Sequence, residues 1–269
     1  MNNPEKERVG TGTLLAAGAH EEGLIRPMKR SAEPEAAPDA LMAMIPANLA
    51  CLLEQNRAGF SAPLDQVFFK IHPYQGEDKK PLCLCGPFLG APQAVMGMEK
   101  LIALGARRIW VLGWCGSLQP DLKAGDLVVP TDAVSEEGTS QHYPIGRRKA
   151  VCDRDLTRIL GEALTREGHG CRTGTVWTTD GPYRETPSKV AQYGREGVLA
   201  VEMEMAALMT LSVYRSVRLA GLLVVSDELA ALKWRPGFRD ARFKAMSRFA
   251  ADFLFRLIQN GVDPEENIP

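Results

Sequence analysis

Apolar residues along the chain fall into short continuous runs, separated by longer segments with helical spacing. Short, largely apolar runs of strand length, typical of strands covered on both faces, occupy residues 67–71, 82–85, 109–112, 127–130, 198–201 and 219–225. Residues 171–178 are also predicted to form a strand. The other segments predict helices at about residues 92–104, 153–168, 188–194, 203–213 and 239–258. This alternation predicts an α/β fold, a single domain with a largely parallel central mixed sheet flanked by helices.

Two of the predicted helices have residues at their ends that favour helix boundaries. Pro92 suits a first helical turn, and Gly105 follows the last apolar position of the same helix. Asp153 is a candidate N-cap. Residues 1–39 mix charges with alanine and proline without a sustained period, so we expect an arm that is flexible or docks on a neighbouring subunit. Residues 40–269 then form the folded domain.

Composition and charge exclude several classes of protein. The 269 residues are 45% hydrophobic, which is enough for a large core. A formal net charge of -1 gives no field that would favour nucleic acid or an anionic membrane. Six cysteines without a Cys-x-x-Cys pair and four widely spaced histidines predict neither a metal site nor a disulfide framework. No run of about eighteen apolar residues occurs, so we expect a reduced, cytoplasmic protein that acts on a small molecule.

Two short acidic segments stand at the edges of apolar runs, at residues 201–204 (Val-Glu-Met-Glu) and 225–227 (Val-Ser-Asp). An unpaired charge is costly to bury, so a polar ligand or a proton transfer would explain acids there. The alternative for Glu202 and Glu204 is a charged helix N-terminus that the helix dipole favours. The alternative for Asp227 is a helix N-cap. We place the candidate active site at these two segments.

Other predicted strands end in residues of unusual chemistry, at residues 113–117 (Gly-Trp-Cys-Gly-Ser), 137–143 (Glu-Gly-Thr-Ser-Gln-His-Tyr) and 178–183 (Thr-Thr-Asp-Gly-Pro-Tyr). Ligands of open α/β sheets bind beyond the carboxyl ends of the strands, where such loops converge. Gly113 and Gly116 would let a substrate approach the backbone closely. Trp114 and Tyr183 are explained equally well as packing residues and as stacking platforms for a ring.

Taken together, these segments resemble the nucleoside phosphorylase family, which includes hexameric purine nucleoside phosphorylases, uridine phosphorylases and purine nucleosidases. The resemblance runs from about residue 82 to residue 227. It rests on Gly-x-Cys-Gly-Ser at residues 113–117, Gly-Asp-Leu-Val-Val at 125–129, Glu-Gly-Thr-Ser at 137–140 and Val-Glu-Met-Glu-Met-Ala-Ala at 201–207. It implies that residues 40–269 are a catalytic domain with the phosphorylase/hydrolase-like fold.

The resemblance also implies roles for particular residues in breaking a ribosyl C1'–N bond. Glu204 would hold the ribose hydroxyls and stabilise the positive charge that develops on the sugar, with Met203 packed against the ring. Asp227, oriented by Ser226, would be the general acid that protonates a purine at N7. Residues 233–235 follow this acid, and one of them could stabilise it as the proton leaves. The remaining substrate-binding residues are Glu202, Gly113, Trp114, Cys115, Gly116, Tyr183 and Thr179.

The chain departs from the family where phosphate would bind. Val111 and Trp114 replace an arginine and a Ser or Thr, Asp65 stands at the position of a neighbouring subunit's arginine, and the N-terminal Gly-Asp-x-x-Arg loop is not found. A phosphate dianion needs several donors or cations. Cations at residues 26–30 or Lys70 could supply them, water could be the acceptor, or the protein could bind nucleosides without turnover. The resemblance implies no cofactor, and phosphate is the expected co-substrate.

Two further expectations concern the base and the assembly. Uridine phosphorylases read uracil with residues that fall at Thr186 and Ser188 here, which favours a purine. Pro182 takes the place of an aromatic residue against the base, so Tyr183 or Trp114 would provide the stacking. Because the family completes its pocket with residues of a neighbouring subunit, we expect a homo-oligomer. A dinucleotide-dependent oxidoreductase is disfavoured, since no Gly-x-Gly-x-x-Gly follows a first strand.

Overall fold

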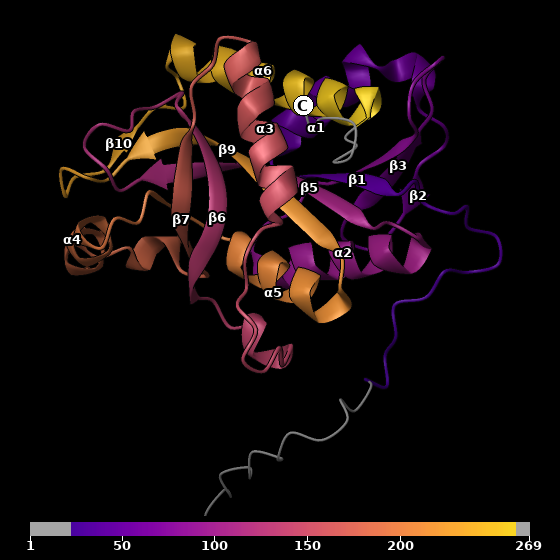
Figure 1. The fold of residues 1–269 in the computed structure, drawn as a ribbon, viewed down its shortest axis with the longest axis horizontal. Helices are drawn as coiled ribbons and strands as arrows, with labels where there is room; N and C mark the ends of the chain where they lie inside the picture. Colours follow the sequence, from indigo (N-terminus) through magenta and orange to yellow (C-terminus); the bar gives the residue numbers. More distant parts are fainter. Residues whose placement is uncertain (1–22, 262–269) are drawn as a thin grey trace, which may run out of the picture.

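The structure is a computed structural model that describes residues 23–261. Its strands form one mixed sheet in the order β10-β9-β6-β7-β8-β5-β1-β4-β3-β2 (Figure 1). The strands are β1 (Asp39–Ala43), β2 (Leu64–Asp65), β3 (Lys70–Tyr74), β4 (Leu82–Gly86), β5 (Arg108–Ser117), β6 (Leu127–Glu136), β7 (Arg172–Thr179), β8 (Ala200–Glu202), β9 (Arg218–Glu228) and β10 (Arg235–Pro236). β9 also pairs with β5, so β5, β9, β6, β7 and β8 close into a barrel-like ring.

Parallel pairs form the centre of the sheet. β1 pairs in parallel with β4 and β5, and β5 pairs in parallel with β9. β7 runs parallel to both β6 and β8. Antiparallel pairs join β5 to β8 and β6 to β9, which closes the ring. The carboxyl ends of β1, β4, β5 and β9 therefore meet at one edge, where ligands of α/β sheets bind.

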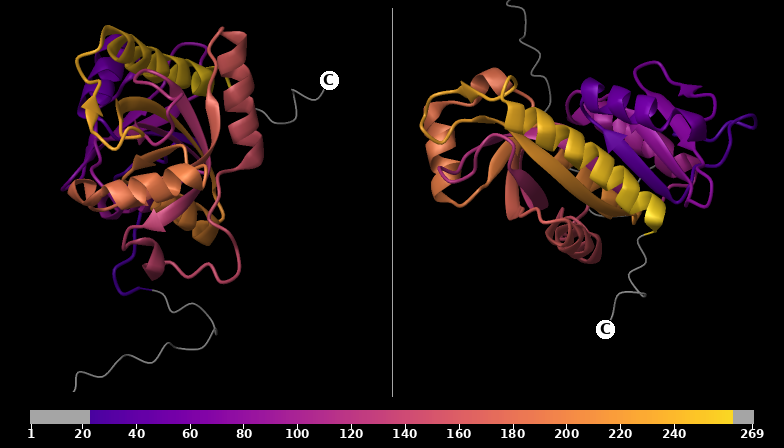
Figure 2. Two further views of the ribbon diagram at one scale, coloured as in Figure 1. Left: turned by 90° about the vertical axis from the view of Figure 1, so that its left-hand side faces the viewer. Right: turned by 90° about the horizontal axis from the view of Figure 1, so that it is seen from above.

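Helices cover both faces of the sheet (Figures 1 and 2). They are α1 (Pro46–Gln55), α2 (Ala91–Leu104), α3 (Arg154–Arg166), α4 (Pro187–Arg195), α5 (Met205–Arg215) and α6 (Ala241–Asn260). α2 and α5 pack together and share one buried core with the sheet, whereas α1, α3 and α6 contribute to a second core on the opposite face. The predicted single α/β domain with a mixed central sheet between helices is confirmed.

Helix boundaries follow the local sequence signals. The Asp153 carboxylate accepts a hydrogen bond from the backbone N–H of Leu156 at 3.0 Å, so the predicted N-cap of α3 is confirmed. Pro92 lies in the first turn of α2. Gly105 ends that helix with a φ of 122°, a backbone conformation that glycine adopts without steric cost.

Two parts of the N-terminal half differ from the prediction. β1 and α1 were not predicted, although β1 is wholly buried between β4 and β5. Residues 67–69 were predicted to begin a strand, but they lie in a loop in which Val67 is 88% exposed and Phe68 is 62% exposed. The ladder between β3 and β4 starts at the pair Lys70 and Gly86, so residues before Lys70 have no partner on β4.

The described part of the predicted N-terminal arm contacts its own chain. Glu33 forms an ion pair with Lys100 of α2 at 2.6 Å, and the N–H of Ala36 donates to the carbonyl of Leu104 at 2.8 Å. Residues 1–22 lie outside the described residues. In the part that the structure describes, no helix is both long and apolar enough to cross a membrane. The same residues contain no group of His, Cys, Asp and Glu side chains that could hold a metal ion.

Candidate active site

A cavity of about 520 Å³ lies where the ends of β5, β8 and β9 meet the loops after β1, β4 and β7. Both predicted acidic segments line it. The full lining consists of Met44, Ile45, Phe88, Leu89, Trp114, Cys115, Gly116, Pro182, Tyr183, Glu185, Val201, Glu202, Met203, Glu204, Ser226, Asp227, Leu229, Trp234 and Phe238. The site is thus built by segments from both halves of the chain.

Gly116 lies between the two acidic segments. It pairs with Val201 of β8 on one side and with Asp227 of β9 on the other, next to an irregularity in the β5–β9 ladder. A Cβ atom at Gly116 would lie 2.6 Å from Cδ1 of Leu229 and 3.0 Å from Oδ2 of Asp227. Only glycine therefore lets the Asp227 carboxylate lie this close to β5.

The Glu202 carboxylate is occupied by protein donors. Its Oε2 accepts hydrogen bonds from the backbone N–H groups of Glu204 and Met205, both at 2.7 Å. Its Oε1 accepts a short bond from the hydroxyl of Thr178, which itself accepts a bond from the N–H of Ala206. Burial raises the pKa of Glu202, although these hydrogen bonds act in the opposite direction. Glu202 thus holds the start of α5, which agrees with the helix-terminus alternative for this residue.

Glu204 lies at the N-cap position of α5 without making a side-chain cap bond. It is 8% exposed and lines the cavity. Its Oε1 accepts a hydrogen bond from the N–H of Gly90 at 2.6 Å, which ties α5 to the loop before α2. Burial raises the pKa of Glu204, and the neighbouring charge of Glu202 adds to the effect. A buried carboxyl of this kind is suited to a ligand that brings its own hydrogen-bond donors.

Asp227 is half-buried at the end of β9, and both of its oxygens are hydrogen-bonded. Oδ1 lies 2.6 Å from the hydroxyl of Ser226, and Oδ2 accepts from the indole N–H of Trp234 at 2.9 Å. The Ser226 oxygen also lies 3.2 Å from the carbonyl of Cys115. A hydroxyl has one proton, so it can donate to an ionised Asp227 or turn to Cys115 and accept from a protonated one. The pair therefore accommodates both states of a general acid.

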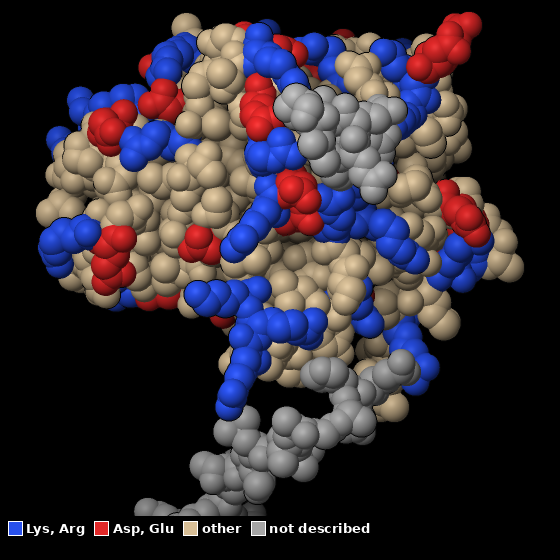
Figure 3. All heavy atoms as spheres, in the orientation of Figure 1, with Lys and Arg blue, Asp and Glu red and all other residues tan. Residues whose placement is uncertain are grey.

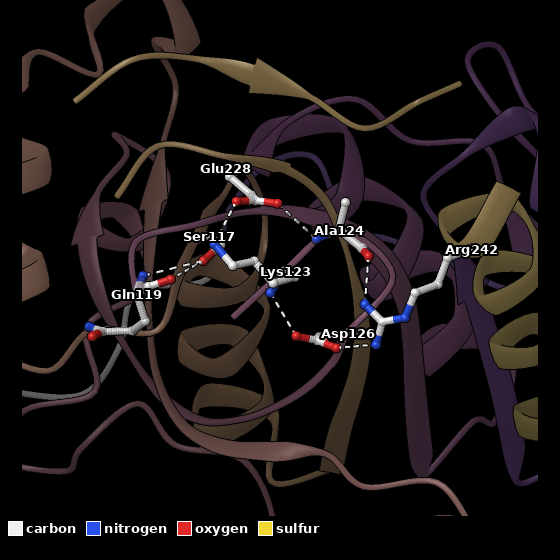
Figure 4. Close-up of polar contacts among 7 residues, drawn as sticks. All are labelled: Ser117, Gln119, Lys123, Ala124, Asp126, Glu228 and Arg242. Carbon is white, nitrogen blue, oxygen red and sulfur yellow. Dashed lines mark hydrogen bonds and ion pairs between the residues drawn. The ribbon is translucent and has the colours of Figure 1, made fainter. Parts of the chain in front are cut away.

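A polar network holds the β5–β6 loop against the end of β9 (Figure 4). Glu228, the last residue of β9, accepts hydrogen bonds from Nζ of Lys123 at 3.0 Å and from the N–H of Ala124 at 3.4 Å. Arg242 of α6 donates to the carbonyl of Ala124 at 2.8 Å and pairs with Asp126. The strand end that carries the candidate acid is therefore fixed from its outer side.

Trp114 forms a wall of the cavity. Its indole N–H donates to the hydroxyl of Ser247 at 3.0 Å, and that hydroxyl donates to the side-chain oxygen of Asn48 at 3.2 Å. The ring packs edge-on against Phe243 with centroids 5.0 Å apart. Trp114 also lines a second cavity of about 620 Å³ between α1 and α6. It is therefore a packing residue that at the same time faces the site.

Most of the other predicted site residues lie at the cavity. Its lining includes Met203, Ser226, Cys115, Gly116 and Tyr183. Tyr183 is 99% exposed, so it stands at the rim. Gly113 lies inside β5, where a Cβ would be 3.1 Å from Leu223, and it does not line the cavity. Thr179 is also absent from the lining; its hydroxyl accepts a hydrogen bond from the N–H of Gly181 at 3.2 Å.

The structure adds cavity residues that the sequence did not indicate. Phe88, Phe238 and Met44 bring apolar surface from the loops after β4 and β10 and from the end of β1. Glu185, which follows the short 3₁₀ turn Pro182–Arg184, adds a half-buried carboxyl. Burial raises the pKa of Glu185 to about 7, with a further contribution from the charge of Asp227. Nothing in the local sequence distinguishes this glutamate from a surface residue.

No Lys or Arg side chain of the described residues lines the cavity. Val111, at the first replaced phosphate position, is 1% exposed inside the core. Lys70 pairs with Asp65 at 3.0 Å on the β2–β3 hairpin. The arm contacts α2 at Lys100, nine residues beyond Ala91, or about 13 Å along the helix. These candidate cations therefore lie outside the cavity wall.

The chain belongs to the phosphorylase superfamily, whose family model matches residues 40–260. The predicted family resemblance is thereby confirmed. The match covers the whole sheet and the helices on both of its faces.

Individual relatives agree with this assignment. A guanosine phosphorylase of Halorubrum lacusprofundi is 30% identical over 70% of this chain and 77% of its own length. A DeoD-type purine nucleoside phosphorylase of Myxococcus xanthus is 33% identical over 62% of this chain and 71% of its own. The solved structure of a P knowlesi homologue of P falciparum PNP matches with a TM-score of 0.67, covering 87% of this chain and 95% of that one. At 22% identity this last likeness shows a shared fold.

Proposed function

We propose that the protein cleaves the N-glycosidic bond of purine nucleosides. The observation that carries this proposal is the meeting of Glu204 and Asp227 in one cavity of about 520 Å³. One acid is buried where it can hold hydroxyl groups, and the other is poised by Ser226 and Trp234 to give up a proton. Bond cleavage at a ribose needs both functions, because charge develops on the sugar and on the base at once.

In the proposed reaction a protonated Asp227 transfers its proton to the purine as the C1'–N bond breaks. The bonding electrons go to the base, which leaves neutral, and the sugar acquires oxocarbenium character. The Asp227 carboxylate that forms accepts hydrogen bonds from Ser226 and Trp234. Glu204 binds the ribose hydroxyls and stabilises the positive charge, and Met203 packs against the sugar.

A purine substrate has two kinds of support. The relatives described above are a guanosine phosphorylase and a purine nucleoside phosphorylase. Thr186 and Ser188, at the positions that read uracil in uridine phosphorylases, bond to each other at 3.1 Å at the start of α4 and do not line the cavity. Neither is therefore available to recognise a pyrimidine base.

Phosphate is the first candidate for the acceptor, which would make the protein a pentosyltransferase with ribose 1-phosphate as product. The names of the relatives support it. Water is the second candidate, because the described cavity is lined by carboxyl groups and by no Lys or Arg. A nucleoside-binding protein without turnover is the remaining alternative. We propose no metal or organic cofactor for any of these reactions.

We also propose a homo-oligomer in which a neighbour covers the rim of the cavity. Three apolar side chains near the rim are exposed: Val67 at 88%, Phe68 at 62% and Leu89 at 75%. Gln93 joins their loops, since it donates to the carbonyl of Phe68 at 2.7 Å and accepts from the N–H of Leu89 at 2.8 Å. Apolar patches of this kind mark interaction surfaces. Light scattering at micromolar concentration would contradict this if only the 29.4 kDa monomer were found.

A product assay tests the proposed reaction. Adenosine, inosine, guanosine and uridine are incubated with the protein with and without phosphate, and base and sugar products are identified. We expect cleavage of a purine nucleoside to exceed that of uridine. Ribose 1-phosphate formed only with phosphate identifies a phosphorylase, and free ribose formed in phosphate-free buffer identifies a nucleosidase. Faster cleavage of uridine than of every purine nucleoside would refute the purine assignment, and no turnover at all would favour the binding protein.

A further inference from the structure

Glu185 differs from the other carboxyl groups of the cavity. Glu202 accepts bonds from protein donors, Glu204 accepts one from Gly90, and Asp227 is bonded to Ser226 and Trp234. The half-buried carboxyl of Glu185 has no hydrogen bond or ion pair with any described residue; only its backbone N–H is bonded, to Pro182. A half-buried polar group without a partner lowers stability.

The surroundings offer Glu185 no partner from the protein. Among the described residues, the titratable groups that line the cavity with it are Cys115, Tyr183, Glu202, Glu204 and Asp227, and none of them is a cation. Burial is the larger cause of the raised pKa of Glu185, and the negative charge of Asp227 also contributes. None of the described residues donates a hydrogen bond to this carboxyl, so a ligand in the cavity can supply the donor.

The position of Glu185 in the cavity indicates which part of a bound nucleoside it contacts. Glu185 follows the turn Pro182–Arg184 after β7 and lines the same cavity as Asp227, the acid assigned to the purine N7 in the proposed function. N7 lies on the edge of the purine that continues into the six-membered ring. Glu185 thus faces the base end of a nucleoside, whereas Met203 and Glu204 hold the sugar end.

We propose, on the basis of the proposed function, that Glu185 recognises the six-membered ring of the purine by accepting a hydrogen bond from an N–H group of that ring or its substituent. Adenine offers a 6-amino group, hypoxanthine offers N1–H, and guanine offers N1–H together with a 2-amino group. Guanine can give a carboxylate two parallel bonds, the strongest arrangement for this acceptor. Unsubstituted purine offers no N–H on the six-membered ring, so its riboside is the matched probe that lacks the contact.

The experiment compares wild type with Glu185→Ala on guanosine, inosine, adenosine and purine riboside. A hydrogen bond to a charged group is lost only with the first three substrates, so kcat/KM should fall roughly 10- to 100-fold for at least one of them and less than about threefold for purine riboside. The largest loss with guanosine or inosine assigns the contact to N1–H, and the largest loss with adenosine assigns it to the 6-amino group. Equal losses with all substrates, purine riboside included, would overturn the proposal.

Two controls separate recognition from a structural role. Glu196→Ala removes an exposed glutamate outside the cavity that bonds Gln192, and it should leave all ratios unchanged. The melting temperature of Glu185→Ala should stay constant or rise, because an unpartnered carboxyl is removed; a marked fall would indicate a structural group. Glu185→Gln keeps the shape and one accepting oxygen, so its loss should lie between those of wild type and Glu185→Ala.

The proposed function and this inference can fail separately. A wild-type protein that cleaves no purine nucleoside refutes the function. In that case isothermal titration with guanine, adenine and purine, on wild type and Glu185→Ala, still tests the recognition. Weaker binding of guanine or adenine by the variant, with purine unaffected, supports the role of Glu185, and identical dissociation constants for all three bases overturn it.

Discussion

Replacing Glu204 with glutamine tests the carboxyl at the centre of the proposed mechanism. The glutamine has nearly the same size and keeps an oxygen that can accept the 2.6 Å bond from Gly90, so the start of α5 is preserved. The variant lacks the negative charge beside the developing ribosyl cation. Loss of one preorganised electrostatic contact removes about 2.7–4 kcal/mol of transition-state stabilisation. We expect kcat/KM to fall roughly 10²- to 10³-fold in steady-state assays.

The pH dependence of nucleoside binding gives a second measure of the same group. Burial raises the pKa of Glu204 above its ordinary value of 4.5, so the empty cavity retains a proton to higher pH. Ribose hydroxyls that donate to the carboxylate favour its ionised form, and binding then releases that proton. Below the raised pKa, the apparent Kd should therefore fall by up to about tenfold for each unit of pH increase. Glu204→Gln should show a weaker pH dependence than wild type, with the contribution of Glu185 remaining.

The raised pKa of Glu204 also determines how the stability of the fold changes with pH. A carboxyl whose pKa is higher in the folded protein stabilises the fold at low pH, and this stability is lost as pH rises from about 4.5 through the raised value. Glutamine does not titrate, so the melting temperature of Glu204→Gln relative to wild type should increase across that window. Glu162→Gln, which alters an exposed carboxyl outside the cavity, should leave kcat/KM unchanged. Wild-type kcat/KM in Glu204→Gln would refute the placement of Glu204 at the ribose.

Two further variants test the setting of the general acid. Gly116→Ala places a Cβ 2.6 Å from Leu229 and 3.0 Å from Asp227, and a displaced acid should lower kcat by about 10²-fold. Gly170→Ala, whose Cβ would meet nothing within 4 Å, is the control, and equal kinetics of the two variants would contradict the argument. Trp234→Phe removes the 2.9 Å donor to Asp227 and should lower kcat about tenfold with little change in KM, whereas unchanged kcat would exclude a role for this bond.

Helices α2 to α6 were predictable because their signals are local, whereas α1 was not predicted. α3 has an N-cap at Asp153, and its buried residues fall on one face at helical spacing. β1 carries no such signal: its sequence, Asp-Ala-Leu-Met-Ala, contains helix-forming residues and no β-branched one. Its strand conformation is decided by pairing with β4 and β5, which lie more than thirty-five residues away in the chain. Val67 and Phe68 are the opposite case: both residue types favour strands, yet they lie in a loop. The β3–β4 ladder begins only at Lys70, so they have no partner on β4.

The site residues that could be predicted from the sequence are those that directly follow predicted strands. Glu204 and Asp227 follow apolar runs, so a charged residue there was conspicuous in the sequence. Glu185 and Phe238 reach the cavity because of the paths of the loops after β7 and β10, which no local sequence pattern predicts. Thr179 was assigned to the cavity from its place in a strand-end segment, yet its hydroxyl bonds the next turn. In such segments alternate side chains point to opposite sides of the sheet, and the sequence alone does not say which side is the site.

The charge of the cavity affects the two candidate reactions, phosphorolysis and hydrolysis, differently. Carboxyl groups from Glu185, Glu202, Glu204 and Asp227 line it, with no Lys or Arg from the described residues. The Glu204 carboxylate, ionised when the ribose is bound, creates a negative field that favours a cationic sugar more than a neutral nucleoside, so its effect is strongest at the transition state. The same field opposes a phosphate dianion. Phosphorolysis therefore requires positive charge from outside the described cavity, for which a neighbouring subunit is the natural source, whereas hydrolysis requires none.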